Sequence, residues 1–334
     1  MKIGSSAVRT DPGRKRRGNE DSYVCRPPLF AIADGMGGAQ AGEIASALAA
    51  GALDESGVTG GGERRVTELI QEANRRVHER AVSDATTSGM GTTMTVMLVE
   101  DDDTITVGHV GDSRAYLLRD GRLEQITDDH SLVAELVRRG ELSPQAAEVH
   151  PQRSVITRAL GTDPDVDVDA FRIEARAGDL YLICSDGLSD MVDGETIERV
   201  LLEHRDDLDA AARALVQAAN RAGGEDNITA LLFDVVEGRQ PAEPDERTRE
   251  YDAAAFHDED TLHPEDGVAP PVEEQPPAAV DTMVVPADEI NAALAAGGTA
   301  SDPQAGLGRR LLALLVIAAL CAVIVVLVWW GLAR

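Results

Sequence analysis

The sequence contains almost no lysine. Among its 334 residues only Lys2 and Lys15 are lysines, and neither follows a glycine. The Gly-Lys-Ser/Thr end of a phosphate-binding loop is therefore missing, which excludes the P-loop NTPases. Both lysines also precede any glycine-rich loop and strand, so neither can be the strand lysine of a protein kinase. Two large classes of nucleotide-dependent enzyme are thus excluded.

Cysteines and aromatic residues are also scarce. The three cysteines are too few and too scattered for a disulfide framework or a zinc site, and they suit a reducing compartment. A cysteine phosphatase has an arginine six residues after its nucleophile, but Ala31 follows Cys25 and Asp190 follows Cys184 at that distance. We interpret the cysteines as small buried thiols. Because aromatic residues make up only 3% of the chain, we expect an aliphatic core.

Basic side chains are far fewer than acidic ones. The formal net charge is −28, and nucleic-acid binding depends on cationic side chains that neutralise phosphates. We therefore expect no nucleic-acid partner. The first 17 residues contain no apolar run of seven or more, so no signal peptide is predicted and the main domain is expected in the cytoplasm.

The chain divides into three regions by composition. Residues 1–237 carry short apolar runs and helical periods separated by glycine-rich turns. Residues 238–308 hold nine of the fifteen prolines, with 16 acidic and 3 basic side chains, which predicts a disordered linker. Residues 309–334 contain an uncharged apolar run, 311–332, that is long enough to cross a bilayer as a helix.

We expect this last region to be a single-pass C-terminal membrane anchor. Arg309 and Arg310 precede the apolar run, and Trp329 and Trp330 stand near its end, where an interfacial belt belongs. From the charge bias we expect residues 1–237 on the cytoplasmic side of the cell membrane.

An α+β fold is predicted for residues 1–237. Helical periods and strands do not alternate one for one, which disfavours a parallel α/β sheet. Strands are expected at 22–24, 29–33, 92–99, 104–110, 115–118, 180–184 and 228–235. Helices are expected at 41–53, 64–82, 131–139, 195–204 and 208–222.

Several aspartates stand at the ends of the predicted strands, next to glycine or another turn-forming residue. These are Asp34, Asp112, Asp186 and Asp226. A single such aspartate usually just caps a turn. Four of them in one domain indicate a site for a hard divalent cation, because Mg²⁺ and Mn²⁺ prefer oxygen ligands.

The motifs around these aspartates resemble a known family, the metal-dependent serine/threonine protein phosphatases of the PP2C (PPM) type, in its bacterial branch. The matches occur in the family's order and cover nearly all of residues 1–237. They are RRGNED (16–21), ADGMGG (33–38), GMGTT (89–93), HVGDSRAYL (109–117), HPQRSVITRALG (150–161), CSDGLSD (184–190) and GGEDNIT (223–229). The linker and terminal helix resemble actinobacterial membrane-tethered members, which are paired with receptor-like kinases.

The resemblance implies a central β-sandwich flanked by helices (α-β-β-α) with two Mn²⁺ or Mg²⁺ ions at one end of the sheets. Asp34 should bridge the ions, and the Gly35 carbonyl, Asp186 and Asp226 should complete the direct shell. Asp21 and Glu20 should act mostly through bound water. A third ion is expected on Asp112, shared with Asp186. Arg16, five residues before Asp21, should hold the substrate phosphate.

In this scheme the two cations activate a bridging hydroxide that attacks phosphorus directly, so no nucleophilic side chain is needed. The animal branch has a histidine, proposed as general acid, where this chain has Met36. His109 is an alternative proton donor, but its position inside a strand favours a structural role, and metal-bound water is the preferred donor. Residues 128–161 resemble a flap over the site, in which His130, His150 and Arg153 are candidate contacts to a phosphopeptide.

The resemblance thus implies a monomeric catalytic domain that hydrolyses phosphoserine and phosphothreonine in proteins at the membrane and opposes a Ser/Thr kinase. One alternative is a phosphoprotein-binding scaffold with little catalysis, but none of Asp34, Asp186 and Asp226 is lost. Another is a phosphatase aimed at a single regulatory partner, as in the control of sigma-factor antagonists. No sensor or kinase module accompanies the domain, which favours the first hypothesis.

Overall fold

The computed structural model describes residues 1–37, 41–56, 61–237 and 283–284. The predicted linker (238–308, except two residues) and membrane anchor (309–334) lie outside the described residues. None of the helices in the described part of the chain has both the length and the apolar character needed to span a bilayer.

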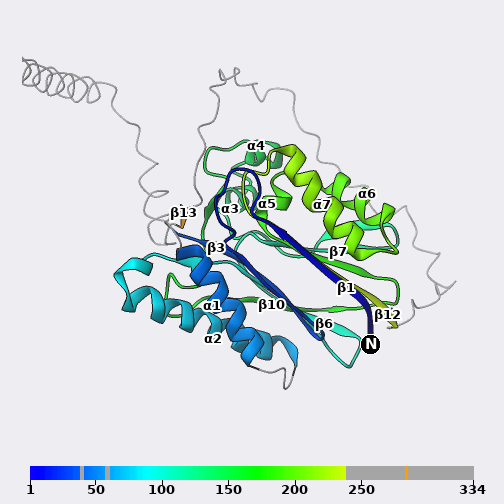
Figure 1. Cartoon of the computed structure of the whole chain (residues 1–334), viewed down its shortest axis with the longest axis horizontal. Helices are drawn as coiled ribbons and strands as arrows, with labels where there is room; N and C mark the ends of the chain where they lie inside the picture. The colour runs from blue at the N-terminus through cyan, green and yellow to red at the C-terminus, as the bar shows by residue number, and fades with distance from the viewer. Residues whose placement is uncertain (38–40, 57–60, 238–282, 285–334) are drawn as a thin grey trace, which may run out of the picture. The chain divides into compact units, whose positions relative to one another are not determined.

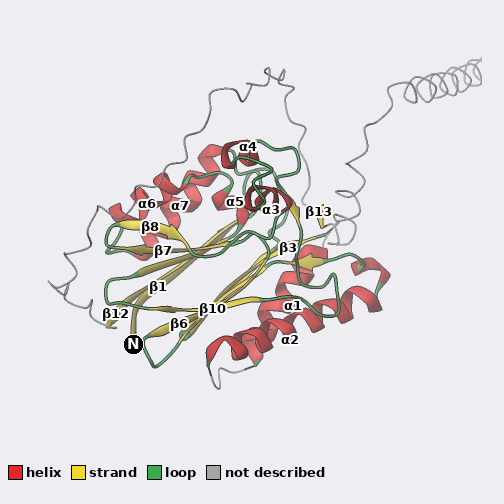
Figure 2. Cartoon of the chain, turned by 180° about the vertical axis from the view of Figure 1, so that it is seen from behind, coloured by secondary structure: helices red, strands yellow, loops and turns green. Residues whose placement is uncertain are grey.

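Two antiparallel sheets face each other across the domain (Figures 1 and 2). The first has the order β1-β12-β11-β7-β8, and its strands are β1 (Lys2–Asp11), β12 (Ile228–Glu237), β11 (Leu180–Cys184), β7 (Arg114–Arg119) and β8 (Arg122–Gln125). The second has the order β10-β6-β5-β3-β2, and its strands are β10 (Asp169–Glu174), β6 (Thr104–Val110), β5 (Met94–Val99), β3 (Leu29–Met36) and β2 (Asp21–Arg26). A short strand, β4 (Gly91–Thr92), pairs with the end of β3.

Helices cover the outer face of each sheet, as the views from front and back show (Figures 1 and 2). The second sheet is covered by α1 (Ala41–Glu55) and α2 (Gly62–Ser83), and the first by α6 (Gly194–Glu203) and α7 (Leu208–Ala222). In α2 the buried residues Val66, Ile70, Ala73 and Val77 follow the helical period, so one face meets the sheet. The predicted α+β sandwich with outer helices is confirmed.

The interior is mainly aliphatic, as expected, with a small aromatic group between the two sheets. Phe30 and Phe233 stack with ring centroids 4.1 Å apart, and Tyr181 stacks on Phe233 at 5.0 Å. All three are fully buried, surrounded by residues such as Ile32, Met97 and Ile183. Phe30, Tyr181 and Phe233 thus lie together where the two sheets meet, since stacked rings fill the space between sheets well.

The sequence prediction missed three strands at the edges of the sheets. The edge strands β1, β8 and β10 were not predicted, and β1 is the first strand of the fold. Its ten residues are intermediate or exposed, and they pair with β12 in antiparallel register. An edge strand with so many polar residues lacks the apolar alternation on which prediction depends.

The remaining elements lie above the open end of the sandwich. They are α3 (Leu132–Arg138), α4 (Pro144–Glu148), β9 (Val155–Ile156) and the short helix α5 (Asp186–Ser189). Met283 and Val284, within the predicted linker, form a strand (β13) that pairs in parallel with β9. A 3-10 turn, η1 (Ala85–Thr87), follows α2.

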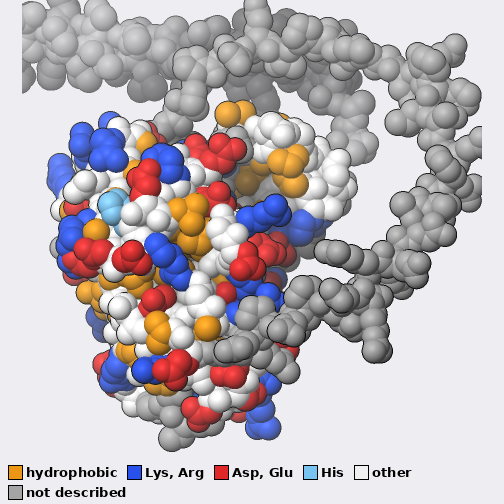
Figure 3. Space-filling model, turned by 90° about the vertical axis from the view of Figure 1, so that its right-hand side faces the viewer, with side chains coloured by type: hydrophobic (Ala, Val, Ile, Leu, Met, Phe, Trp, Pro, Cys, Tyr) orange, Lys and Arg blue, Asp and Glu red, His pale blue; other side chains and the backbone are white. Residues whose placement is uncertain are grey.

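On the side of the domain seen in Figure 3, acidic and basic side chains are interspersed and apolar side chains occur in small groups. The negative charge of the chain is therefore not gathered into one continuous acidic face on this side.

Candidate active site

The strand ends bring the predicted carboxylates together. Asp34 lies near the end of β3, opposite Asp21 at the start of β2 in the antiparallel register. Asp112 follows β6, Asp186 begins α5 directly after β11, and Asp226 precedes β12. The charges of the other four all act on Asp34. Segments that are far apart in sequence, from Asp21 to Asp226, thus converge on one acidic cluster.

The environment of this cluster opposes ionisation. Burial raises the pKa of Asp34 and Asp186 well above the usual value, and the neighbouring aspartates raise it further. Burial likewise raises the pKa of Asp21 to about 6 and that of Asp112 to about 7. Four carboxyls crowded in this way gain from a cation, because a positive ion favours their charged forms.

Two oxygens in the cluster have no hydrogen-bond partner although they are buried, Oδ1 of Asp21 and Oδ1 of Asp112. Buried carboxylate oxygens without partners are costly unless a cation or water meets them. Together with the all-oxygen donor set, they fit a hard divalent cation. Within the described ranges, no group of three or more His, Cys, Asp or Glu side chains is arranged so that it could hold one metal ion.

Other hydrogen bonds hold Asp21 in place. Its Oδ2 accepts from the hydroxyls of Ser185 (2.9 Å) and Thr229 (2.6 Å), which lower its pKa against the effect of burial. The backbone of Glu20 accepts from the N–H of Gly35 at 3.1 Å, so the segment carrying Asp21 is tied to the turn after Asp34. Burial raises the pKa of Glu20, and the charge of Arg16 lowers it.

The predicted phosphate ligand also lies at the cluster. Nη2 of Arg16 donates to Oδ2 of Asp226 at 2.7 Å, and both side chains are partly exposed. A guanidinium beside a cluster carboxylate brings a planar set of N–H donors to the site, the geometry that suits a phosphate. Arg16 and Asp226 are therefore brought together although 210 residues separate them.

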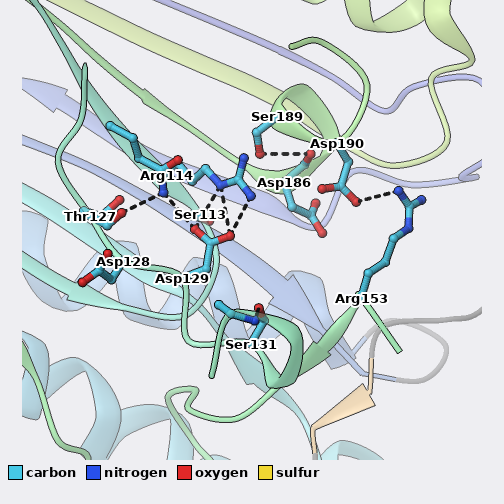
Figure 4. Close-up of polar contacts among 12 residues, drawn as sticks. Ser113, Arg114, Thr127, Asp128, Asp129, Ser131, Arg153, Asp186, Ser189 and Asp190 are labelled. Carbon is cyan, nitrogen blue, oxygen red and sulfur yellow. Dashed lines mark hydrogen bonds and ion pairs between the residues drawn. The ribbon is translucent and has the colours of Figure 1, made fainter. Parts of the chain in front are cut away.

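One carboxylate of the cluster was not among the predicted site residues. Asp190 is close enough to Asp186 and Asp112 to raise the pKa of both, and burial raises its own pKa. Arg153 of the flap reaches toward it, with 3.8 Å between Nη1 and Oδ2 (Figure 4). Its place four residues after Asp186, one helical turn further on, was the available sequence signal.

The flap region lies against the turn that carries Met36. Met36 packs with Ile156 and Ala159 in a small apolar cluster, and the backbones of Thr92 and Leu160 exchange hydrogen bonds of 2.9 and 3.1 Å. Beneath it, Arg114 makes a bidentate contact to Asp129, with bonds of 2.7–3.1 Å (Figure 4). Of the candidate flap residues, Arg153 alone is placed here beside a cluster carboxylate.

The histidines have other partners. In His109, which is fully buried, Nδ1 lies 2.9 Å from the Thr95 hydroxyl and Nε2 3.1 Å from the Asp128 carbonyl. Burial lowers its pKa to about 3, so it is neutral at pH 7. His130 accepts from the N–H of Gly111 and contacts Asp169, and His150 accepts from the N–H of Gln152. These contacts favour the structural reading of His109 over the proton-donor alternative.

The chain is similar to known proteins in both sequence and structure. The sequence model of a family described as Protein phosphatase 2C matches residues 19–232. A serine/threonine protein phosphatase PstP of Mycobacterium tuberculosis is 43% identical over 234 residues, which are 69% of this chain and 45% of that protein. This chain thus spans less than half the length of that relative.

A serine/threonine phosphatase Stp of Listeria monocytogenes is 39% identical over 238 residues, covering 68% of this chain and 94% of that protein. A crystal structure of the PstP catalytic domain in complex with two manganese ions has a TM-score of 0.64 and 39% identity, covering 70% of this chain and 99% of that one. The chain belongs to the protein phosphatase 2C family.

Proposed function

We propose that this protein hydrolyses phosphoserine and phosphothreonine in other proteins, using two Mn²⁺ or Mg²⁺ ions. The observation that carries the proposal is the convergence of the carboxylates from separate strand ends beside Arg16. The similarity to named serine/threonine phosphatases, one of them solved with two manganese ions, supports it.

In this proposal Asp34, Asp186, Asp226 and the Gly35 carbonyl hold the two ions, and Asp21 and Glu20 act around them. Asp112 shares a third ion with Asp186. When bound, the ions lower the pKa of coordinated water and neutralise charge on the phosphoryl oxygens. Arg16 binds phosphate oxygens through its planar fork and orients the ester.

The test is hydrolysis of p-nitrophenyl phosphate and of a phosphothreonine peptide by the full-length protein. We expect chelation by EDTA to abolish both activities and Mn²⁺ to restore them. Activity that persists in metal-free buffer would refute the metal-dependent scheme. A phosphoprotein-binding scaffold with little catalysis, the alternative hypothesis, would bind the peptide and leave it phosphorylated.

We further propose that the enzyme is anchored in the cell membrane by 311–332, with the catalytic domain in the cytoplasm, and that it opposes a Ser/Thr kinase. The uncharged apolar run and the arginines before it support this. Membrane fractionation and protease protection test the anchor and its orientation. Phosphoproteomics on a deletion strain tests the opposition to a kinase, since substrate sites should gain phosphate.

A further inference from the structure

Asn227 has no role in the scheme above, yet its side chain is bonded to the loop that carries Arg16. Its Nδ2 donates to the carbonyls of Pro12 (3.0 Å) and Gly18 (2.9 Å), and its Oδ1 accepts from the N–H of Glu20 (2.7 Å). Only 4% of Asn227 is exposed. A single buried amide thus fastens both ends of the loop 12–20, with Arg16 between them.

The same loop is packed closely against the segment before Asn227. The N–H groups of Arg14 and Lys15 donate to the carbonyl of Gly224 at 2.7 and 3.2 Å. Gly13 has a φ of +75°, and a Cβ there would lie 2.2 Å from the carbonyl oxygen of Asp226. The loop has no regular secondary structure of its own, so these contacts decide the path of its backbone.

Asn227 also touches the segments that carry two of the cluster carboxylates. Its backbone N–H donates to Oδ1 of Asp226 at 2.8 Å, and its carbonyl accepts from the hydroxyl of Ser185, next to Asp186, at 3.2 Å. The residue therefore stands where the Arg16 loop, the Asp186 turn and Asp226 meet.

We infer that Asn227 is a positioning residue that sets the affinity for the substrate phosphate by holding Arg16 against the metal cluster. The inference rests on the proposed function. If the amide is removed, the carbonyls of Pro12 and Gly18 and the N–H of Glu20 lose their partner, and the loop relaxes. Arg16 then no longer meets the phosphate in one orientation, whereas the backbone N–H of residue 227, which the substitution leaves in place, still donates to Oδ1 of Asp226.

The chain offers a matched control in Asn74, which is fully buried. Its Nδ2 donates to the carbonyls of Asp163 (3.0 Å) and Pro164 (3.1 Å), and its Oδ1 accepts from the N–H of Gly161 (2.8 Å). The bonding pattern is the same as that of Asn227, but the loop it holds does not carry Arg16. Asn74→Ala therefore removes three hydrogen bonds of the same kind. It leaves the loop that carries Arg16 unchanged.

The experiment measures KM and kcat for p-nitrophenyl phosphate, inhibition by inorganic phosphate, and Mn²⁺ affinity by calorimetry, in the full-length protein. For Asn227→Ala we expect KM to rise about tenfold, with weaker inhibition by phosphate and unchanged affinity for Mn²⁺. Asn74→Ala should lower the melting temperature but leave KM unchanged. In an Arg16→Ala background, Asn227→Ala should raise KM no further, because it acts through Arg16.

An unchanged KM in folded Asn227→Ala, or an equal further rise in the Arg16→Ala background, would overturn the inference. Asn227→Ser, which keeps a small polar group, replaces Asn227→Ala if that variant does not fold, with the same expectations. If Arg16→Ala itself leaves KM unchanged, the assignment of Arg16 in the proposed function fails. If Arg16→Ala raises KM and Asn227→Ala does not, only the positioning role fails.

Discussion

Two walls of the site are held in different ways. The arginine wall, residues 12–20 and 223–227, is fastened by the side chain of Asn227, by the Gly224 carbonyl and by the ion pair of Arg16 with Asp226. The flap, residues 128–161, consists of two short helices and the two-residue strand β9. The arginine wall is hydrogen-bonded along its length, whereas the flap is bonded mainly at its ends.

The ends of the flap are well anchored. His130 and Gly111 are joined by two bonds of 2.8 and 3.0 Å, and Arg158 pairs with Asp169. Between these points Val149 is 79% exposed, and Arg153 lies 3.8 Å from Asp190. A weak surface ion pair contributes little to stability.

We propose on this ground that the arginine wall serves the chemistry and the flap serves recognition of the substrate protein. Groups that must meet a phosphoryl group in one geometry need rigid support. Groups that meet the variable protein part of a substrate tolerate looser support. We therefore expect changes in the arginine wall and metal cluster to affect all substrates, and changes in the flap to affect peptides selectively.

The largest effect is expected for Asp34→Asn. The variant loses a cluster carboxylate that four other charges surround, so Mn²⁺-dependent turnover should fall about a hundredfold or more on both p-nitrophenyl phosphate and peptide. Because the substitution removes repulsion, the metal-free variant should melt at a higher temperature than the metal-free wild type. Asp101→Asn, on the surface, is the control. Retained turnover in Asp34→Asn would place the chemistry elsewhere.

A smaller and selective effect is expected for Arg153→Ala. Loss of its contact with the Asp190 region should raise KM for phosphothreonine peptides about three- to tenfold, while p-nitrophenyl phosphate, which is too small to reach the flap, is hydrolysed as before. Arg139→Ala is the control, since Arg139 is exposed on the same flap and pairs with Glu135 at 3.4 Å. An equal loss on both substrates would show that the flap belongs to the chemical machinery.

The pH dependence of stability should separate the metal cluster from the flap. In the metal-free protein burial raises the pKa of Asp21 to about 6 and of Asp112 to about 7. The folded state then holds protons that the unfolded state has released above about pH 4. This stabilisation is complete below that pH and is lost as the pH rises through 6 and 7.

The melting temperature in EDTA should therefore fall by a few degrees between pH 5.5 and pH 8. Saturating Mn²⁺ should flatten the curve, because the cation stabilises the charged carboxylates. Arg139→Ala should keep the wild-type slope, since Arg139 is exposed and pairs with Glu135. A flat curve in EDTA would mean that these carboxyls are already ionised in the folded protein.

The carboxylates of the site could be predicted from the sequence, but the hydrogen bonds that position their segments could not. The aspartates stand at ends of strongly apolar strands, so β3 and β11 were predictable and their ends marked the site. The supports Ser185, Asn227 and Thr229 lie inside motifs that resemble the family, yet their partners are about 160 to 215 residues away. Such bonds follow only from the packing of two sheets, which local pattern does not contain. Asp190 was missed because its spacing of one helical turn from Asp186, the one local signal, is shared by many solvated helix residues.

The smallest effect is expected from two matched helix caps, one in the body of the domain and one in the flap. Asp207 caps α7 by accepting from the N–H of Ala210 at 2.9 Å, and Ser143 caps α4 by accepting from that of Ala146 at 3.2 Å. Each alanine substitution removes one cap, worth about 1 kcal/mol.

Because α7 packs on the first sheet, Asp207→Ala should lower the free energy of global unfolding by about that amount. Ser143→Ala should leave global unfolding unchanged and speed proteolysis within 128–161, since the flap opens without the rest of the domain. Equal loss of global stability in both variants, measured by urea denaturation, would show that the flap and the body unfold as one unit.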